Sequence, residues 1–167
     1  MDLKALGTKA IGDTGEYYVA AELTKRGYTV TIAKDNTHLI DLIVINPDGT
    51  KTKNIQVKTT TNKQNKWKIN KKCEKMHNSN LWYVFVKLDI DNELTPSSYH
   101  ICSSSTVAKR SKAYGKQSRA IHVEANKKRS KKKKVKRTST SVNTRFFLDE
   151  ENKFVDKWKN LNLDWWL

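Results

Sequence analysis

A single carboxylate interrupts one of the most apolar stretches of the chain. Residues 39–45 read Leu-Ile-Asp-Leu-Ile-Val-Ile, the pattern of a strand buried on both faces, and Asp41 carries its only charge. Burying an unpaired carboxylate is costly unless a cation or hydrogen bonds compensate for the lost water. We therefore expect Asp41 to face a compensating group in the folded protein.

The segment after this strand can supply that group. Residues 46–49 (Asn-Pro-Asp-Gly) form a strong turn signal, and residues 54–60 read as a return strand, so the two strands are expected to form a hairpin. If the turn is centred near residues 48–49, Asp41 lies opposite residues 56–58 (Gln-Val-Lys).

Side chains alternate along a strand, so Gln56 and Lys58 are expected on one face, beside Asp41. Such a cluster can hold a divalent cation through oxygen atoms. The ligands would be the Asp41 carboxylate, the Gln56 amide oxygen, a backbone carbonyl and water.

The elements that must position this cluster form an alternating α/β pattern. A helix is expected over residues 6–26, with Ile11, Gly15, Val19 and Leu23 as its buried stripe and Gly27 as its stop. Further strands are expected at residues 28–33, 82–86 and 98–102, with residues 67–69 as a strand or loop. A short helix is expected at 105–112, and a C-terminal helix face at Phe154, Trp158 and Leu161. The expected fold is α/β, a mixed central sheet of four to five strands flanked by helices.

The spacing of Asp41 and the triplet Gln56-Val57-Lys58 resembles the D-x(n)-(E/Q)-x-K core of PD-(D/E)XK nucleases. Glu16 on the first helix fits this resemblance, because nucleases similar to archaeal Holliday junction resolvases carry a glutamate there. The resemblance covers about the first two-thirds of the chain and implies a restriction-endonuclease-like sheet. Ile40 stands where the family name has proline. Gln56 replaces the acidic residue, as in Mrr-type restriction endonucleases.

What the resemblance implies is a metal-dependent DNA endonuclease of the restriction or Holliday-junction-resolvase type. Its catalytic residues would be Asp41, Gln56, Lys58 and Glu16. Asp41, Gln56, Val57 and Glu16 would hold Mg²⁺, for which Mn²⁺ can substitute, and Lys58 would position the attacking water. The alternative is a non-catalytic basic protein that binds DNA or RNA on a degenerate nuclease fold. A structural or interaction protein on such a fold is a third interpretation.

The charge of the chain favours a polyanionic partner. The formal net charge is +16 and the pI about 9.8, so DNA, double-stranded or branched, is the expected partner. A charge surplus that serves solubility is the plainer alternative, and a homodimer is left open.

No basic amphipathic helix, signal peptide or apolar span suggests a membrane, so the cytoplasm is expected. The cysteines and histidines show no spacing that suggests zinc or triad chemistry.

Basic residues dominate the second half of the chain. Nine of the eleven residues from 127 to 137 are Lys or Arg, so residues 109–144 are expected to form a mobile basic arm or insertion. Within a single domain, this arm separates a nuclease core (1–108) from a C-terminal helical segment that packs on the core (145–167). The residues expected to contact nucleic acid are Lys63, Lys66, Lys68, Lys71, Lys72, Lys127, Lys128, Arg129, Lys131, Lys132, Lys133, Lys134, Lys136 and Arg137.

Overall fold

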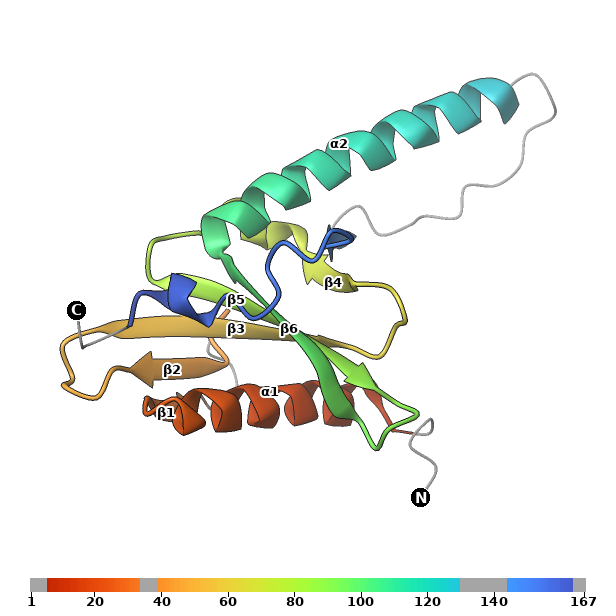
Figure 1. The fold of residues 1–167 in the computed structure, drawn as a ribbon. Helices are drawn as coiled ribbons and strands as arrows, with labels where there is room; N and C mark the ends of the chain where they lie inside the picture. Colours follow the sequence, from red (N-terminus) through yellow and green to blue (C-terminus); the bar gives the residue numbers. More distant parts are fainter. Residues whose placement is uncertain (1–5, 34–38, 130–143, 164–167) are drawn as a thin grey trace.

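A computed structural model describes residues 6–33, 39–129 and 144–163 of the chain (Figure 1). Its elements follow one another in this order: α1 (Thr8–Lys25), β1 (Thr29–Ile32), β2 (Leu42–Ile45), β3 (Thr52–Thr60), β4 (Lys66–Asn70), the 3₁₀ turn η2 (Lys71–Glu74), β5 (Leu81–Asp89), β6 (Thr95–Ser103), α2 (Ser104–Arg129), β7 (Thr144–Leu148) and the 3₁₀ turn η3 (Trp158–Leu161).

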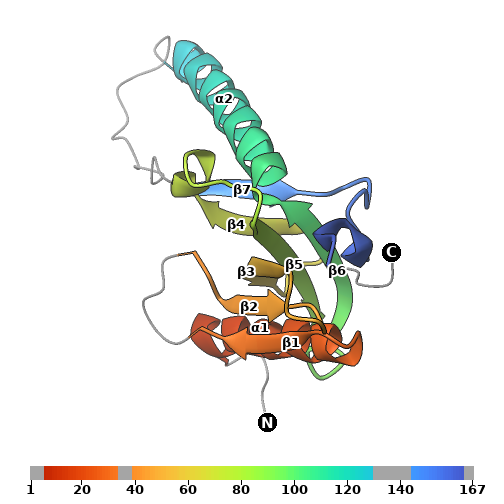
Figure 2. The same ribbon diagram turned by 90° about the vertical axis from the view of Figure 1, so that its left-hand side faces the viewer.

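The centre of the molecule is a five-stranded sheet in the order β1-β2-β3-β5-β6. All its neighbouring strands are antiparallel except β3 and β5, which run parallel, so the sheet is mixed. β4 and β7 form a separate antiparallel pair. Figure 2 shows α1 on one side of the central sheet and the β4–β7 pair with α2 on the other. The expected α/β fold with a mixed central sheet flanked by helices is confirmed.

The buried stripe of α1 is the one that the spacing of its residues predicted. Val19 and Leu23 are fully buried, and Gly15 is buried with them. A Cβ at Gly15 would lie 2.0 Å from the Thr59 Oγ1 atom of β3, so glycine is required for this close approach of helix and sheet. Gly27 has a φ of +87°, the left-handed conformation that commonly ends a helix.

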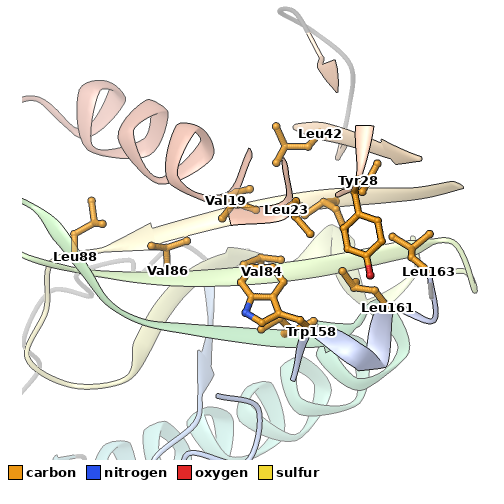
Figure 3. Packing of buried hydrophobic residues seen from close by; sticks show 14 of the residues in the cluster. Val19, Leu23, Tyr28, Leu42, Val84, Val86, Leu88, Trp158, Leu161 and Leu163 are labelled. Carbon is orange, nitrogen blue, oxygen red and sulfur yellow. The ribbon is translucent and has the colours of Figure 1, made fainter. Parts of the chain in front are cut away.

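Two hydrophobic cores lie on the two faces of the central sheet. The first lies between α1 and the sheet and includes Trp158, Leu161 and Leu163 from the C-terminal segment (Figure 3). The second lies under the β4–β7 pair, where the rings of Phe85 and Phe147 stack 4.1 Å apart. β5 contributes alternate residues to both cores, which explains its nearly continuous apolar sequence.

The second core includes a buried histidine whose partners are distant in the sequence. His100 Nδ1 lies 2.7 Å from Asp149 Oδ2, and its Nε2 lies 3.0 Å from Ser98 Oγ. Asp149 also accepts the backbone N–H groups of Lys153 and Phe154. This chain of hydrogen bonds joins β6 to the segment that follows β7. Burial lowers the pKa of His100, against the opposing effect of Asp149.

The C-terminal segment differs from the helix that its apolar spacing suggested. Its described residues after β7 include the 3₁₀ turn η3 and no α-helix. Trp158 and Leu161 are buried in the first core, but Phe154 packs against the second. Positive φ values at Asn152 and Asp156 break any helical path between them. The segment instead runs beside β6, where the Phe154 carbonyl accepts the Ile101 N–H.

Helix α2 is longer than the expected helix at residues 105–112. It spans 26 residues and takes in residues 109–129, for which the charge pattern predicts a mobile arm. Lysine, arginine and alanine are frequent there, and all are good helix formers. The first turns are fixed by packing, since Arg110 Nη1 donates to Leu148 O at 2.6 Å and the rings of Tyr114 and Phe146 lie 5.6 Å apart. Figure 1 shows the rest of α2 extending beyond the sheets.

Neither α1 nor α2, as far as the structure describes them, could cross a membrane.

Candidate functional site

Asp41 lies at a bend immediately before β2, not within the strand as its apolar neighbours suggested. β2 begins at Leu42, and Leu39 has a φ of +72°, which turns the chain before the strand starts. The backbone of Asp41 is held on both sides: its N–H donates to Ile55 O and its carbonyl accepts the Ala33 N–H, both at 2.9 Å. The carboxylate is therefore attached to a well-fixed point of the sheet.

The register of the hairpin agrees with the expected one. Leu42 pairs with Ile55, which brings Asp41 next to Gln56 and Val57. The Asp41 Oδ2 atom accepts the Val57 backbone N–H at 2.6 Å. A charge-assisted bond of this kind both satisfies the carboxylate and fixes its direction.

Gln56 and Lys58 project from the face of the sheet that is opposite α1. Ile55 and Val57 belong to the core under α1, so the alternating residues Gln56 and Lys58 point the other way. Gln56 is only 8% exposed.

Glu16 belongs to α1, which covers the other face of the sheet, and its charge interacts with those of Asp41 and Lys58. Burial and the negative charges of Asp41 and Asp13, against the opposing charge of Lys58, raise the pKa of Glu16 to about 6. Burial also raises the pKa of Asp41, against the opposing effects of Lys58 and of the Val57 N–H. Two carboxylates and one ammonium therefore interact, and their combined charge is negative when all three are ionised.

Carboxylate and amide oxygens are the ligand types that a hard divalent cation prefers. No group of three or more His, Cys, Asp and Glu side chains suited to a metal occurs within the described ranges. Glu16 and Asp41 supply two carboxylates, and the Gln56 amide adds a neutral oxygen. Mg²⁺ commonly binds through one or two carboxylates, several waters and substrate phosphates. The residues thus suit Mg²⁺ or Mn²⁺ better than a metal that needs nitrogen or sulfur ligands.

Tyr83 is a neighbour of the cluster that its sequence context does not single out. It pairs with Gln56 across β3 and β5, and its buried hydroxyl has no hydrogen-bond partner in the described part of the chain. Burial raises its pKa well above the ordinary value, with smaller contributions from Cys73 and Asp41. In the sequence it is a tyrosine in an apolar strand, which is usually a core residue.

The expected nucleic-acid contacts fall into two groups. Lys63, Lys68 and Lys72 are exposed on the loop before β4, on β4 and on η2, while Lys71 is half-buried. Lys66 lies 4.5 Å above the ring of Phe146 and so also has a packing role. The other group is Lys127, Lys128 and Arg129 at the end of α2, continued by Lys131, Lys132, Lys133, Lys134, Lys136 and Arg137, which lie outside the described residues.

Two cavities are relevant to the location of a site. One of about 550 Å³ lies between α2 and the segment around β7, where Arg110, Tyr114 and Phe146 line it. It includes none of the expected catalytic residues. The second, of about 280 Å³, is lined by Ile40, the residue directly before Asp41.

Comparison with known proteins gives a likeness to solved structures. The chain matches no family model and no curated protein sequence. Among solved structures, it is similar to that of a bacterial homing endonuclease, I-Ssp6803I. The sequence identity is 16% and the TM-score 0.44, over 60% of this chain and 67% of that one.

Proposed function

We propose that the protein is a metal-dependent DNA endonuclease. The observation that supports this most directly is the hydrogen bond between Asp41 Oδ2 and the Val57 N–H at 2.6 Å. This bond fixes a partly desolvated carboxylate beside Gln56. Gln56 lies on β3, the strand that also carries Lys58. Glu16 adds a second carboxylate within the range of charge interaction. Paired carboxylates beside a lysine are suited to metal-assisted attack on a phosphodiester.

The roles of the residues follow from their chemistry. Asp41 and Glu16, with the Gln56 amide oxygen and the Val57 carbonyl, would hold Mg²⁺ or Mn²⁺. When bound, the ion polarises the scissile phosphate and lowers the pKa of a water molecule. Lys58 orients that water and stabilises the negative charge that develops on the phosphate. The family resemblance implies a product with a 5′-phosphate.

A cleavage assay tests this proposal. Plasmid, single-stranded and branched DNA would be incubated with the protein in Mg²⁺, in Mn²⁺ and in EDTA, and cutting is expected only with metal. Asp41→Asn and Lys58→Ala should each abolish cutting, with unchanged circular dichroism. Asp91→Asn and Lys112→Ala are matched controls, because both residues are exposed and distant in sequence from the cluster. The proposal fails if wild-type protein leaves every substrate intact, or if Asp41→Asn cuts as well as the wild type.

A second function, DNA or RNA binding without cleavage, is favoured by a specific feature. Gln56 leaves the site with two carboxylates, where an acidic residue at that position would give three. Fewer charges on the ligands weaken the binding of a hard cation. Under this account the wild type and Asp41→Asn bind DNA equally well in EDTA, and neither cuts it in Mg²⁺.

A further inference from the structure

The smaller cavity opens beside the candidate active site. Ile40 forms part of its wall and directly precedes Asp41, and Asn54 lies two residues before Gln56 on β3. Residues i and i+2 of a strand project from the same face and lie about 7 Å apart. The Asn54 part of its wall is therefore on the face of the sheet that carries Gln56 and Lys58, and Gln56 is the nearer of the two.

Its walls combine apolar surface with amide groups. Ile40 and Leu81 provide apolar surface, and so does Met76, which is 44% exposed. Asn54 and Asn78 contribute amides. The volume of about 280 Å³ lies just below the range of roughly 300–1,000 Å³ for sites that bind drug-sized ligands. A single planar ring system with apolar faces and polar edges matches both the size and the lining.

The fold fixes the polar part of this lining in advance. Asn78 Oδ1 accepts the backbone N–H groups of Asn80 and Leu81, both at 2.9 Å. The oxygen is thereby used, and the NH₂ group is what the Asn78 side chain can offer to a ligand. It is a donor suited to the acceptor atoms on the edge of a base. The thioether of Met76 makes favourable contacts with aromatic rings.

The charge near the cavity suits a ligand that is attached to phosphates. Lys75 and His77 both line it, and His77 is exposed to solvent. The chain as a whole has a net charge of +16. A polyanion that carries planar rings therefore fits this position better than an apolar peptide or a neutral small molecule.

We propose that the cavity receives an unpaired nucleobase of the DNA strand that lies across Asp41 and Lys58. The inference rests on the proposed function, because the base would come from a DNA strand bound at that cluster. In a continuous duplex every base is stacked and paired, so filling the cavity requires a nucleotide that is already unpaired or is extruded. The preferred substrate class is therefore DNA with a bulged, mismatched or single-stranded nucleotide.

The experiment compares the binding of three labelled duplexes of one sequence by fluorescence anisotropy in EDTA at constant salt. The first is fully paired, the second carries one unpaired nucleotide, and the third carries an abasic residue at the unpaired position. We expect the second to bind about ten-fold more tightly than the other two, because only its unpaired base can fill the cavity. Because the readout is binding without metal, it does not depend on whether the protein cuts DNA.

Variants of Met76 connect the preference to the cavity. Met76→Ala should reduce the preference for the unpaired base by about five-fold, and Met76→Leu should largely restore it, since leucine keeps the apolar wall. Ile32→Ala is the matched control, because Ile32 is 41% exposed on β1, at the edge of the sheet. Equal binding of the bulged and abasic duplexes, or a preference unaffected by Met76→Ala, would overturn the inference even if the protein cuts DNA. Absence of cleavage with a preserved preference would instead reject only the proposed function, and failure to bind any DNA would reject both.

Discussion

Glu16→Gln should make the metal-free protein more stable while it removes activity. In the folded protein the pKa of Glu16 is raised from its ordinary value of 4.5 to about 6, first by burial and then by Asp41. At 1.36 kcal/mol for each pH unit, this rise corresponds to about 2 kcal/mol. Because Glu16 keeps partial contact with water, we expect about 1–2 kcal/mol. Glutamine has nearly the same shape and carries no charge.

The sign of the effect follows from proton linkage. A carboxyl whose pKa is higher in the folded state holds its proton more tightly there than in the unfolded chain. Raising the pH from 4.5 to 6 therefore destabilises the wild type, and the full cost is present above about pH 7. Below pH 4.5 Glu16 is protonated in both states and costs nothing. The advantage of Glu16→Gln should accordingly be near zero at pH 4 and largest at pH 7.5.

Urea unfolding at pH 4, 5.5 and 7.5 in EDTA measures this difference directly. Adding Mg²⁺ at ten times its dissociation constant should stabilise the wild type by about 1.4 kcal/mol and the variant by less. Glu22→Gln, on the same helix, is a control that should change the stability in the opposite direction. Burial raises the pKa of Glu22, but hydrogen bonds from Lys25 and Arg26 outweigh it and leave that pKa lowered. A Glu16→Gln variant that is no more stable than the wild type at pH 7.5, or equally favoured at pH 4, would refute this reasoning.

Three further predictions concern other parts of the molecule. Gln56→Glu adds a negative charge at the site, so half-maximal cleavage should require less Mg²⁺, with activity retained or raised, in a metal titration of the cleavage rate. Gly15→Ala forces a methyl group against Thr59 and should cost about 1–3 kcal/mol in urea unfolding. Gly12→Ala, which meets nothing within 4 Å, should stabilise by about 0.5–1 kcal/mol. Neutralising the basic run 127–137 to Gln or Ser should keep the fold and the metal dependence. It should also make the slope of log affinity against log salt shallower by about 0.9 for each DNA phosphate that the variant no longer neutralises, and an unchanged slope would show that the run does not touch DNA.

Local patterns were sufficient to predict the parts of the fold that depend on neighbouring residues. The spacing of Gly15, Val19 and Leu23 identified the buried face of α1, and Gly27 marked its end. The turn at residues 46–49 fixed the register of the hairpin, which in turn places Asp41 next to residues 56–58. In each case, the period of the element and one turn signal determine the outcome.

Features that depend on contacts between distant segments were not predictable in this way. β4 pairs with β7 across more than seventy residues, and no local pattern at Lys66–Asn70 indicates that partner. The apolar residues near the C-terminus recur at a helical spacing, but in the structure they do not form an α-helix. The hydrogen bonds between Asp149 and the backbone of Lys153 and Phe154 hold that segment in a turn.

The candidate site depends both on local sequence patterns and on contacts between distant segments. The hairpin alone places Asp41 next to Gln56 and Val57, while the close approach of α1 to β3 brings the charge of Glu16 within range of Asp41 and Lys58. That approach depends on the absence of a side chain at Gly15, whose Cβ would lie 2.0 Å from the Thr59 Oγ1 atom. Gly15 directly precedes Glu16, and Thr59 directly follows Lys58. The packing of the helix on the sheet therefore also sets how far Glu16 lies from Lys58 and Asp41. A residue larger than glycine at position 15 should disturb the charges of the site along with the packing, so its effect on metal binding should exceed what the decrease in stability alone would produce.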